Sequence, residues 1–247
     1  MNPQSAYIRY RASTELFELV QTYIDGVEGP EPQPDVDVLV RAMDLFVKES
    51  VATFVLQPAA HVGLKPAFLK MINSLSKLTE KSAMMLVNKV ARKMSLQDHR
   101  NAAEYMQSVR LTYEEGDQMV GDILFPIRSE FAEMGWETRV KMLGGQAKDP
   151  AVLAEGIKFL HEVIDVANLW VFEKPMEILQ LGPVMRKLAV STVGTVKKAT
   201  HSLINTLVPK ISEQQTVASA EYFSGIVGPG PFSREYGQIP DGFLAAR

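Results

Sequence analysis

The chain has 247 residues without a cysteine, and its 26 Lys and Arg against 29 Asp and Glu give a net charge of −3. The absence of cysteine excludes disulfides, thiolate nucleophiles and cysteine-bound metals. The small net charge excludes a histone-like polycation and a chain that charge repulsion keeps unfolded. Because the first residues show no signal-peptide pattern and no run of about 18 apolar residues occurs, we expect a soluble, cytoplasmic protein of one large or two small domains.

Apolar residues recur at helical spacing along most of the chain, and no run alternates strictly enough to indicate a strand, so we predict an all-α protein. A first helix is expected over 13–26, where Gly26 ends it and a linker rich in Pro and Gly follows. A second helix is expected over 35–57, because Asp35 suits the N-cap position and Pro58 disfavours a helical residue before it.

The helices predicted next are longer. One is expected over 66–95 and another over 95–115. Residues 117–143 are predicted to form a further helix that Pro126 kinks. Asp149 then caps a helix that has a proline at its first position, which is the usual order of these two residue types.

An internal repeat emerges when the chain is compared with itself at an offset of 117 residues. Identical residues occupy 14 of the 48 positions from 58 to 105. They are Pro58/Pro175, Leu64/Leu181, Pro66/Pro183, Lys70/Lys187, Ser74/Ser191, Lys81/Lys198, Leu86/Leu203, Asn88/Asn205, Lys93/Lys210, Ser95/Ser212, Gln97/Gln214, Ala103/Ala220, Glu104/Glu221 and Tyr105/Tyr222. Other positions exchange one apolar residue for another, among them Val87/Ile204, Val90/Leu207, Met94/Ile211 and Met106/Phe223. Helical composition does not explain the matched prolines or the Ala-Glu-Tyr triplet, so we predict a tandem duplication.

The duplication predicts a helical bundle in which two copies pack about a pseudo-twofold axis, because one copy alone cannot bury its apolar surface. The long helices are expected as its central pair, and Pro209 predicts that the second of them ends near Val208, one turn earlier than the first. The expected organisation is one domain with an N-terminal helix and linker (1–34), copy one (35–115), a bridging helix segment (116–149), copy two (150–227) and an irregular, Gly- and Pro-rich C-terminal arm (228–247). The arm is expected to cross a groove or to reach a neighbouring subunit.

Charge is distributed unevenly, since residues 58–95 carry +6, residues 182–212 carry +5 and the rest of the chain carries −14. We prefer the interpretation that these basic side chains meet acidic neighbouring helices. The alternative is a surface that binds an anionic partner, and its candidate residues are Lys70, Lys77, Lys81, Lys89, Lys93, Lys187, Lys197, Lys198 and Lys210. Lysine outnumbers arginine ten to two in these segments and aromatic residues are almost missing, so nucleic acid is disfavoured and a membrane surface fits slightly better.

Few residues point to chemistry. None of the four histidines recurs at the offset of 117, the Glu-x-x-His and His-Glu-x-x-His spacings are absent, and no phosphate-binding loop occurs, so we expect no metal and no cofactor. The weak catalytic candidates are Glu104 and Tyr105 with their counterparts Glu221 and Tyr222. Two carboxylates related by a twofold axis could share a proton or bind a metal. We prefer a structural hydrogen bond that recurs because the fold recurs.

These observations favour a function without catalysis. We expect a helical scaffold or binding module that engages a protein partner, a second copy of itself, or an apolar or anionic ligand, through the groove between the copies and the C-terminal arm. One alternative is an enzyme whose site lies between the copies and uses Glu104 and Glu221. Another is reversible binding to an anionic membrane or polymer surface through the lysine-rich helices.

Overall fold

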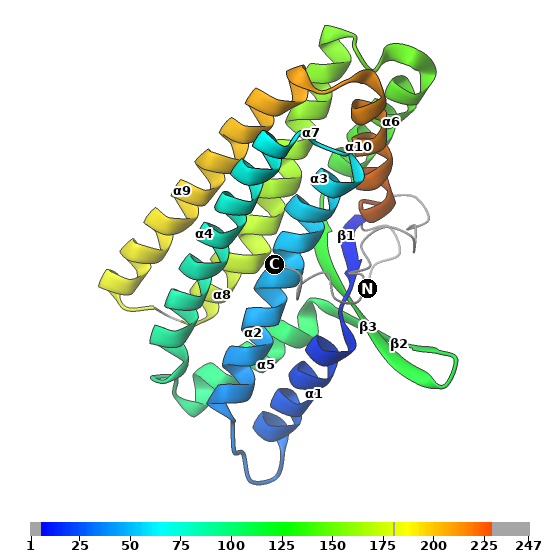
Figure 1. Cartoon of the computed structure of the whole chain (residues 1–247). Helices are drawn as coiled ribbons and strands as arrows, with labels where there is room; N and C mark the ends of the chain where they lie inside the picture. The colour runs from blue at the N-terminus through cyan, green and yellow to red at the C-terminus, as the bar shows by residue number, and fades with distance from the viewer. Residues whose placement is uncertain (1–5, 180, 229–247) are drawn as a thin grey trace.

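The computed structural model describes residues 6–179 and 181–228, which are mostly helical with one small sheet (Figure 1). The first half contains β1 (Ala6–Arg11), α1 (Thr14–Glu28), α2 (Val36–Val51), the π-helical turn η1 (Ala52–Leu56), α3 (Gln57–His61), α4 (Pro66–Ala91), α5 (Leu96–Ser108) and β2 (Arg110–Glu115). The second contains β3 (Gln118–Ile127), α6 (Ser129–Lys141), the π-helical turn η2 (Met142–Gln146), α7 (Pro150–Asn168), the π-helical turn η3 (Leu169–Glu173), α8 (Lys174–Ile178), α9 (Pro183–Leu207), the 3-10 turn η4 (Val208–Lys210) and α10 (Glu213–Ile226). Among the described helices, none combines the length and the hydropathy that a membrane span needs.

The sheet corrects the expectation of an all-α chain. Its strands lie in the order β1–β3–β2, and both pairings are antiparallel. In β1 the buried residues Ala6, Ile8 and Tyr10 alternate with more exposed ones, which is the period of a strand with one buried face. β2 and β3 form a hairpin around Gly116, whose φ of 63° lies in the left-handed region that glycine adopts without strain.

The hairpin replaces parts of two predicted helices. The helix expected over 95–115 ends at Ser108, and the helix expected over 117–143 is instead β3 followed by α6. Pro126 lies in β3, opposite Tyr7 of β1, rather than at a helix kink. The predicted bridging segment is therefore partly the central strand of the sheet.

Several predicted helix ends are confirmed. The side chains of Asp35 and Asp149 accept amide hydrogen bonds at the N-termini of α2 and α7. α9 ends at Leu207, close to the position where Pro209 was expected to stop it. The end of α4 at Ala91 corresponds to Val208, so α9 is shorter by one residue and not by the predicted turn. Gly26 does not end the first helix, which continues to Glu28.

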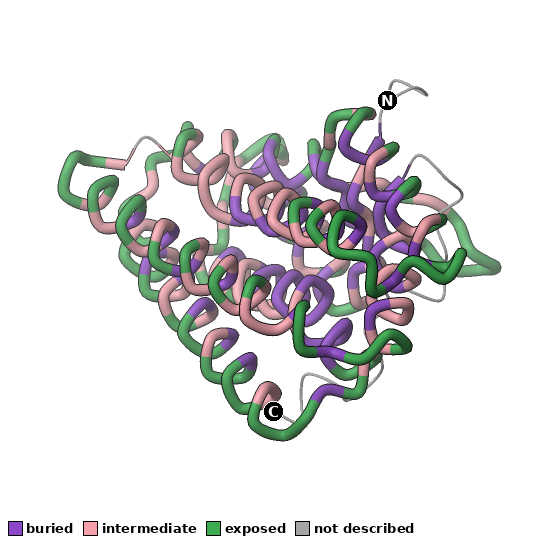
Figure 2. The backbone as a smooth tube through the Cα atoms, turned by 90° about the horizontal axis from the view of Figure 1, so that it is seen from above, coloured by how far each residue is buried: buried purple, intermediate pink, exposed green. Residues whose placement is uncertain are grey.

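The molecule is layered (Figures 1 and 2). α4 and α9 lie side by side as an outer layer, in which α4 packs on α2 and α9 packs on α7. The sheet lies on the other side of α2 and α7, with α1, α5, α6 and α10 around it. The central helices are therefore α2 and α7, and the expectation that the two long helices form the central pair is wrong.

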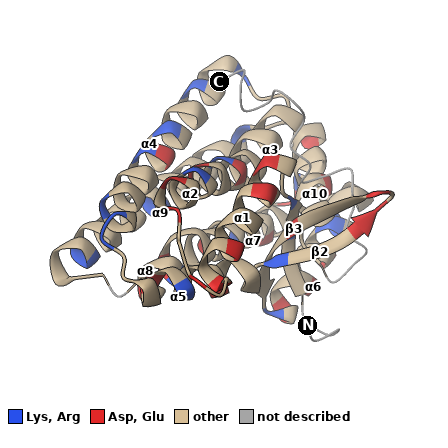
Figure 3. Cartoon of the chain, turned by 90° about the horizontal axis from the view of Figure 1, so that it is seen from below, with Lys and Arg blue, Asp and Glu red and all other residues tan. Residues whose placement is uncertain are grey.

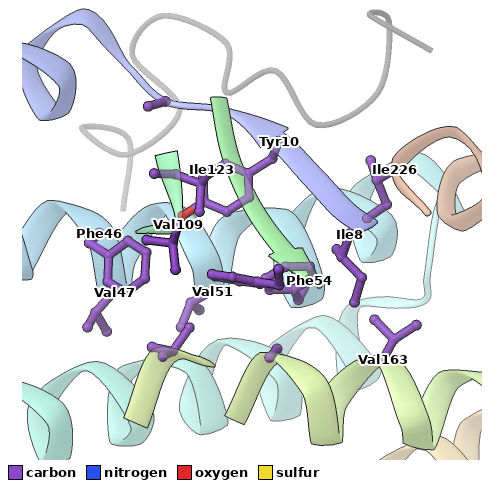
Figure 4. Close-up of a cluster of buried hydrophobic side chains, with 14 of the residues drawn as sticks. Ile8, Tyr10, Phe46, Val47, Val51, Phe54, Val109, Ile123, Val163 and Ile226 are labelled. Carbon is purple, nitrogen blue, oxygen red and sulfur yellow. The ribbon is translucent and has the colours of Figure 1, made fainter. Parts of the chain in front are cut away.

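The main core lies between the sheet and the central helices (Figure 4). Ile8 and Tyr10 of β1 face Phe54 of η1 and Val163 of α7 in this layer. Phe125 of β3 is fully buried among them. Since burial of one such side chain stabilises the fold by about 1.5–3 kcal/mol, this layer holds the strands and the helices together.

The bounds of the elements recur at the offset of 117 residues. η1 and η3 correspond residue for residue, as do α3 and α8, and α4 and α9 both begin at a matched proline. Ser95 and Ser212 each form a capping box with the third residue of the following helix. In the sheet, Ile8 pairs with Phe125, which stands 117 positions later in the chain.

After α10 the chain returns to the sheet. Val227 forms an isolated bridge with Ile8, and the amide of Gly228 donates a hydrogen bond of 2.9 Å to the carbonyl oxygen of Tyr7. The predicted C-terminal arm begins here, and its residues 229–247 lie outside the described part of the chain.

Candidate functional site

The second helix was predicted to end before Pro58, and this prediction is wrong. α2 continues through η1 into α3 without leaving helical backbone angles. In η1 the amide of Gln57 bonds to the carbonyl of Ala52, five residues back, and Pro58 has no amide hydrogen to give. The carbonyl oxygen of Thr53 therefore has no backbone donor at the position where the helix would supply one.

A tyrosine from the other half of the chain supplies the missing donor. The hydroxyl of Tyr222 donates to the carbonyl oxygen of Thr53 at 2.8 Å, and its oxygen lies 2.8 Å from Oε1 of Gln57. Tyr105 donates in the same way to the carbonyl oxygen of Trp170, which Pro175 leaves without a backbone donor. Burial raises the pKa of both tyrosines, so both hydroxyls remain protonated donors.

The structure does not bring the two candidate glutamates together. Glu104 is exposed on α5 and Glu221 is half-buried on α10, and these helices lie at different ends of the molecule (Figure 1). The described residues contain no group of three acidic or histidine side chains arranged to hold a metal. The neighbouring tyrosines serve the helix backbone, so these four residues do not form a common site in this arrangement.

Eight of the nine candidate lysines are exposed, and the ninth, Lys197, is half-buried. Lys197 forms an ion pair of 2.9 Å with Asp165 of α7, as the interpretation of internal pairing expects. No other lysine of the nine forms a salt bridge with a described residue. Most of the positive charge on the long helices therefore faces solvent.

Charged side chains on the outer side of the sheet pair with one another. Asp122 of β3 is 2% exposed and pairs with Arg9, and its other oxygen lies 3.4 Å from Nε of Arg11. The hydroxyl of Tyr113 donates to the same carboxylate at 3.0 Å. Since its partners occupy both oxygens, Asp122 has a structural role in linking the three strands.

The first apolar cavity has a volume of about 80 Å³ and lies between α2, α4 and α5 on one side and η3 and α8 on the other. Its walls include Met43 and Val47 of α2, Leu86 and Val90 of α4, and Pro175 of α8. Apart from the tyrosine hydroxyl, which is already bonded, every lining side chain is apolar. The lining of this cavity therefore offers no free hydrogen-bonding side chain.

The second cavity has a volume of about 100 Å³ and lies between α7, α9 and α10 on one side and η1 and α3 on the other. Its lining corresponds to that of the first at the offset of 117. The matched positions are Met43/Leu160, Val47/Ile164, Ala83/Thr200, Leu86/Leu203, Val87/Ile204, Val90/Leu207, Ala91/Val208, Met94/Ile211, Ala102/Ser219, Met106/Phe223, Phe54/Val171, Val55/Phe172, Pro58/Pro175, Ala59/Met176, Val62/Leu179 and Leu64/Leu181. Each cavity therefore takes its walls from both halves of the chain.

Comparisons of the chain with protein-family models, with curated proteins and with solved structures give no match. The candidate site therefore depends on the geometry alone. The sequence did contain a signal for it, because the apolar exchanges Val87/Ile204, Val90/Leu207, Met94/Ile211 and Met106/Phe223 all line the two cavities.

Proposed function

We propose that this protein is a tandem duplication that binds small apolar ligands, without catalysis, in two equivalent cavities between its halves. The observation that carries the proposal is the position-by-position match between the linings of the two cavities. A chance packing defect has no reason to recur at the same offset as the sequence identities.

The element bounds and the strand register support the duplication. In the β1–β3 ladder, Tyr7 pairs with Pro126 and Arg9 pairs with Leu124. The offset of 117 converts the first pair into the second, and it likewise exchanges Ala6↔Ile127 with Tyr10↔Ile123. A pseudo-twofold axis that passes between Ile8 and Phe125 therefore accounts for these five pairs of the ladder. The repeated unit then includes a strand and the helix after it, and is longer than the copies expected at 35–115 and 150–227.

The size and lining of the cavities support a small apolar ligand. A cavity needs roughly 10–15 Å³ to hold one water molecule, and apolar cavities of larger size remain dry and accept apolar guests. Burying about 100 Å² of a ring-sized ligand supplies roughly 2.5 kcal/mol. This is less than the roughly 4.1 kcal/mol that corresponds to a Kd of 1 mM, so we expect weak binding of single rings or short alkyl chains, with a Kd on the order of 10 mM.

Methyl NMR can observe the two cavities separately. The first cavity is lined by four methionines, Met43, Met94, Met106 and Met176. Among the described residues, no methionine lines the second cavity. Ile164, Ile204 and Ile211 line the second. Titration of methyl-labelled protein with benzene should shift the resonances of these seven residues, whereas the exposed Met119 should not respond.

Two matched substitutions provide the control. Ala102→Leu narrows the first cavity and Ser219→Leu narrows the second, at corresponding positions of α5 and α10. Each should abolish the response of its own cavity and preserve the response of the other. If benzene shifts no lining methyl in the wild-type protein, or if neither substitution affects the response, the proposed function is wrong.

A further inference from the structure

α4 and α9 lie side by side, and Figure 3 shows Lys and Arg positions along both helices. We call their exposed residues the basic face. It includes five exposed lysines and five exposed apolar side chains. The lysines are Lys70, Lys77, Lys81, Lys187 and Lys198. The apolar side chains are Met71, Leu78, Met85, Val184 and Val190.

The charge of these two helices is strongly one-sided. α4 and α9 together carry eight lysine and arginine residues and one acidic residue, Glu80. The protein as a whole has a net charge of −3, so its other surfaces are acidic on balance. A positive face on an acidic molecule orients that molecule toward a negatively charged partner.

The apolar side chains distinguish between possible partners. Met71, Leu78 and Met85 recur every seven residues, so they form one line along α4, and they are 50, 47 and 39% exposed. On α9, Val184 is 82% exposed and Val190 is 59% exposed. The phosphate backbone of a nucleic acid binds polar and charged side chains, whereas apolar side chains can be buried at the boundary between lipid headgroups and acyl chains.

From these observations we propose that the basic face binds reversibly to the surface of an anionic lipid bilayer, with α4 and α9 parallel to the membrane plane. The lysines contact the acidic headgroups, and the five apolar side chains enter the headgroup region between them. A second copy of the chain fits this face poorly, because two such faces would repel each other. The inference does not depend on the two cavities.

Vesicle sedimentation tests the proposal. The full chain is mixed with vesicles of phosphatidylcholine containing about one third phosphatidylserine, and with vesicles of phosphatidylcholine alone. Binding is expected only to the anionic vesicles and should weaken as salt is raised from low to moderate concentration. The double substitution Lys77→Glu and Lys81→Glu should weaken binding more than about tenfold.

Further variants test whether binding depends on where the positive charge lies and on the apolar side chains of the basic face. Arg100→Glu with Lys158→Glu makes the same change in charge at exposed positions on α5 and α7, and should preserve binding. Leu78→Ser with Val190→Ser removes apolar surface from the face and should weaken binding to vesicles several-fold, whereas Met119→Ser on β3 should have no effect. Circular dichroism verifies that each variant is folded.

Three results would overturn the proposal. The first is equal binding to neutral and anionic vesicles, or binding to neither. The second is equal loss of binding in the face variant and in the Arg100/Lys158 control. The third is binding to a polyanion without an apolar phase, such as heparin or poly-U RNA, that is as tight as binding to vesicles and is unaffected by Leu78→Ser with Val190→Ser.

Discussion

The hydroxyl of Tyr222 donates a hydrogen bond of 2.8 Å to the carbonyl oxygen of Thr53, although 169 positions separate the two residues in the chain. The bond exists because Pro58 leaves that carbonyl without its helical donor. Tyr105 and Trp170 stand in the same relation beside Pro175. The matched prolines and the matched tyrosines of the sequence are therefore partners, and each half of the chain completes a helix in the other.

The substitution Tyr222→Phe tests this relation. It leaves the buried carbonyl of Thr53 without a donor, and we expect the free energy of unfolding to fall by about 1–3 kcal/mol in urea denaturation. In a Pro58→Ala background the same substitution should cost less, because residue 58 then has an amide hydrogen. An equal cost in the two backgrounds would show that the tyrosine acts through packing alone.

Glu49 of α2 makes the stability depend on pH. It is 0% exposed, and its carboxylate accepts hydrogen bonds from the hydroxyl of Ser13 at 2.5 Å and from the amide of Ser13 at 3.2 Å. Burial raises the pKa of Glu49 from 4.5 to about 7 despite these bonds. The native state thus holds a proton between pH 4.5 and 7 that the unfolded chain has released.

The sign of the effect follows from linkage. The protonation of Glu49 stabilises the native state, and this contribution to the free energy of unfolding is fully present below pH 4.5. It is lost as the pH rises through 7, and the loss is about 3 kcal/mol at most. We expect Glu49→Gln to remove this part of the pH dependence and to be more stable than the wild type at pH 8. Urea denaturation of both proteins at pH 5 and pH 8 measures the difference, and parallel pH profiles would contradict the assignment.

Gly135 of α6 faces an aromatic pair in the core. A Cβ atom at this position would lie 2.1 Å from Cε2 of Phe159, whose ring stacks on Phe131 with centroids 4.9 Å apart. Gly135→Ala should therefore lower the free energy of unfolding by about 1–3 kcal/mol through overpacking. Gly144→Ala is the control, because nothing lies within 4 Å of its Cβ position and its effect on thermal unfolding should be small.

His161 and His201 stack face to face between α7 and α9, with ring centroids 4.1 Å apart and planes 7° apart. Burial, and then the nearby His201, lower the pKa of His161 below 6.5. Neutral His161 therefore contributes to the free energy of unfolding above pH 6.5, and this contribution is lost as the pH falls through its lowered pKa. We expect His201→Gln to raise the titration midpoint of His161 in histidine NMR spectra. An unchanged midpoint would mean that His201 has no influence on it.

The sequence signals for helix starts were strong because each depends on local chemistry. Asp35 and Asp149 cap the helices they were predicted to cap, and Ser95 begins α5 as expected. These positions need only one side chain and its own backbone. The ends of helices were harder to place, since nothing in the sequence near Ser108 marks the change from α5 to β2.

The strands and the proline turns depended on contacts that no local pattern reveals. β1 alternates for only six residues, and β3 is buried along its centre, so its apolar run resembles a helix. Pro58 indicated a helix end because proline lacks an amide hydrogen, but a tyrosine 164 positions later removes that penalty. The matched apolar residues were visible in the sequence, whereas the space between them depends on how both halves pack.

The ladder centred on Ile8 and Phe125 has a consequence for how such a chain arises. In the proposed duplication, an ancestral half on its own would leave its strand edge unpaired, and two identical halves would join along that edge as a homodimer. Fusion into one chain replaces assembly from two molecules with assembly within one, so it no longer depends on protein concentration. Fusion also lets the two cavities diverge, and one is now rich in methionine while the other contains leucine, isoleucine, phenylalanine and alanine at the same positions.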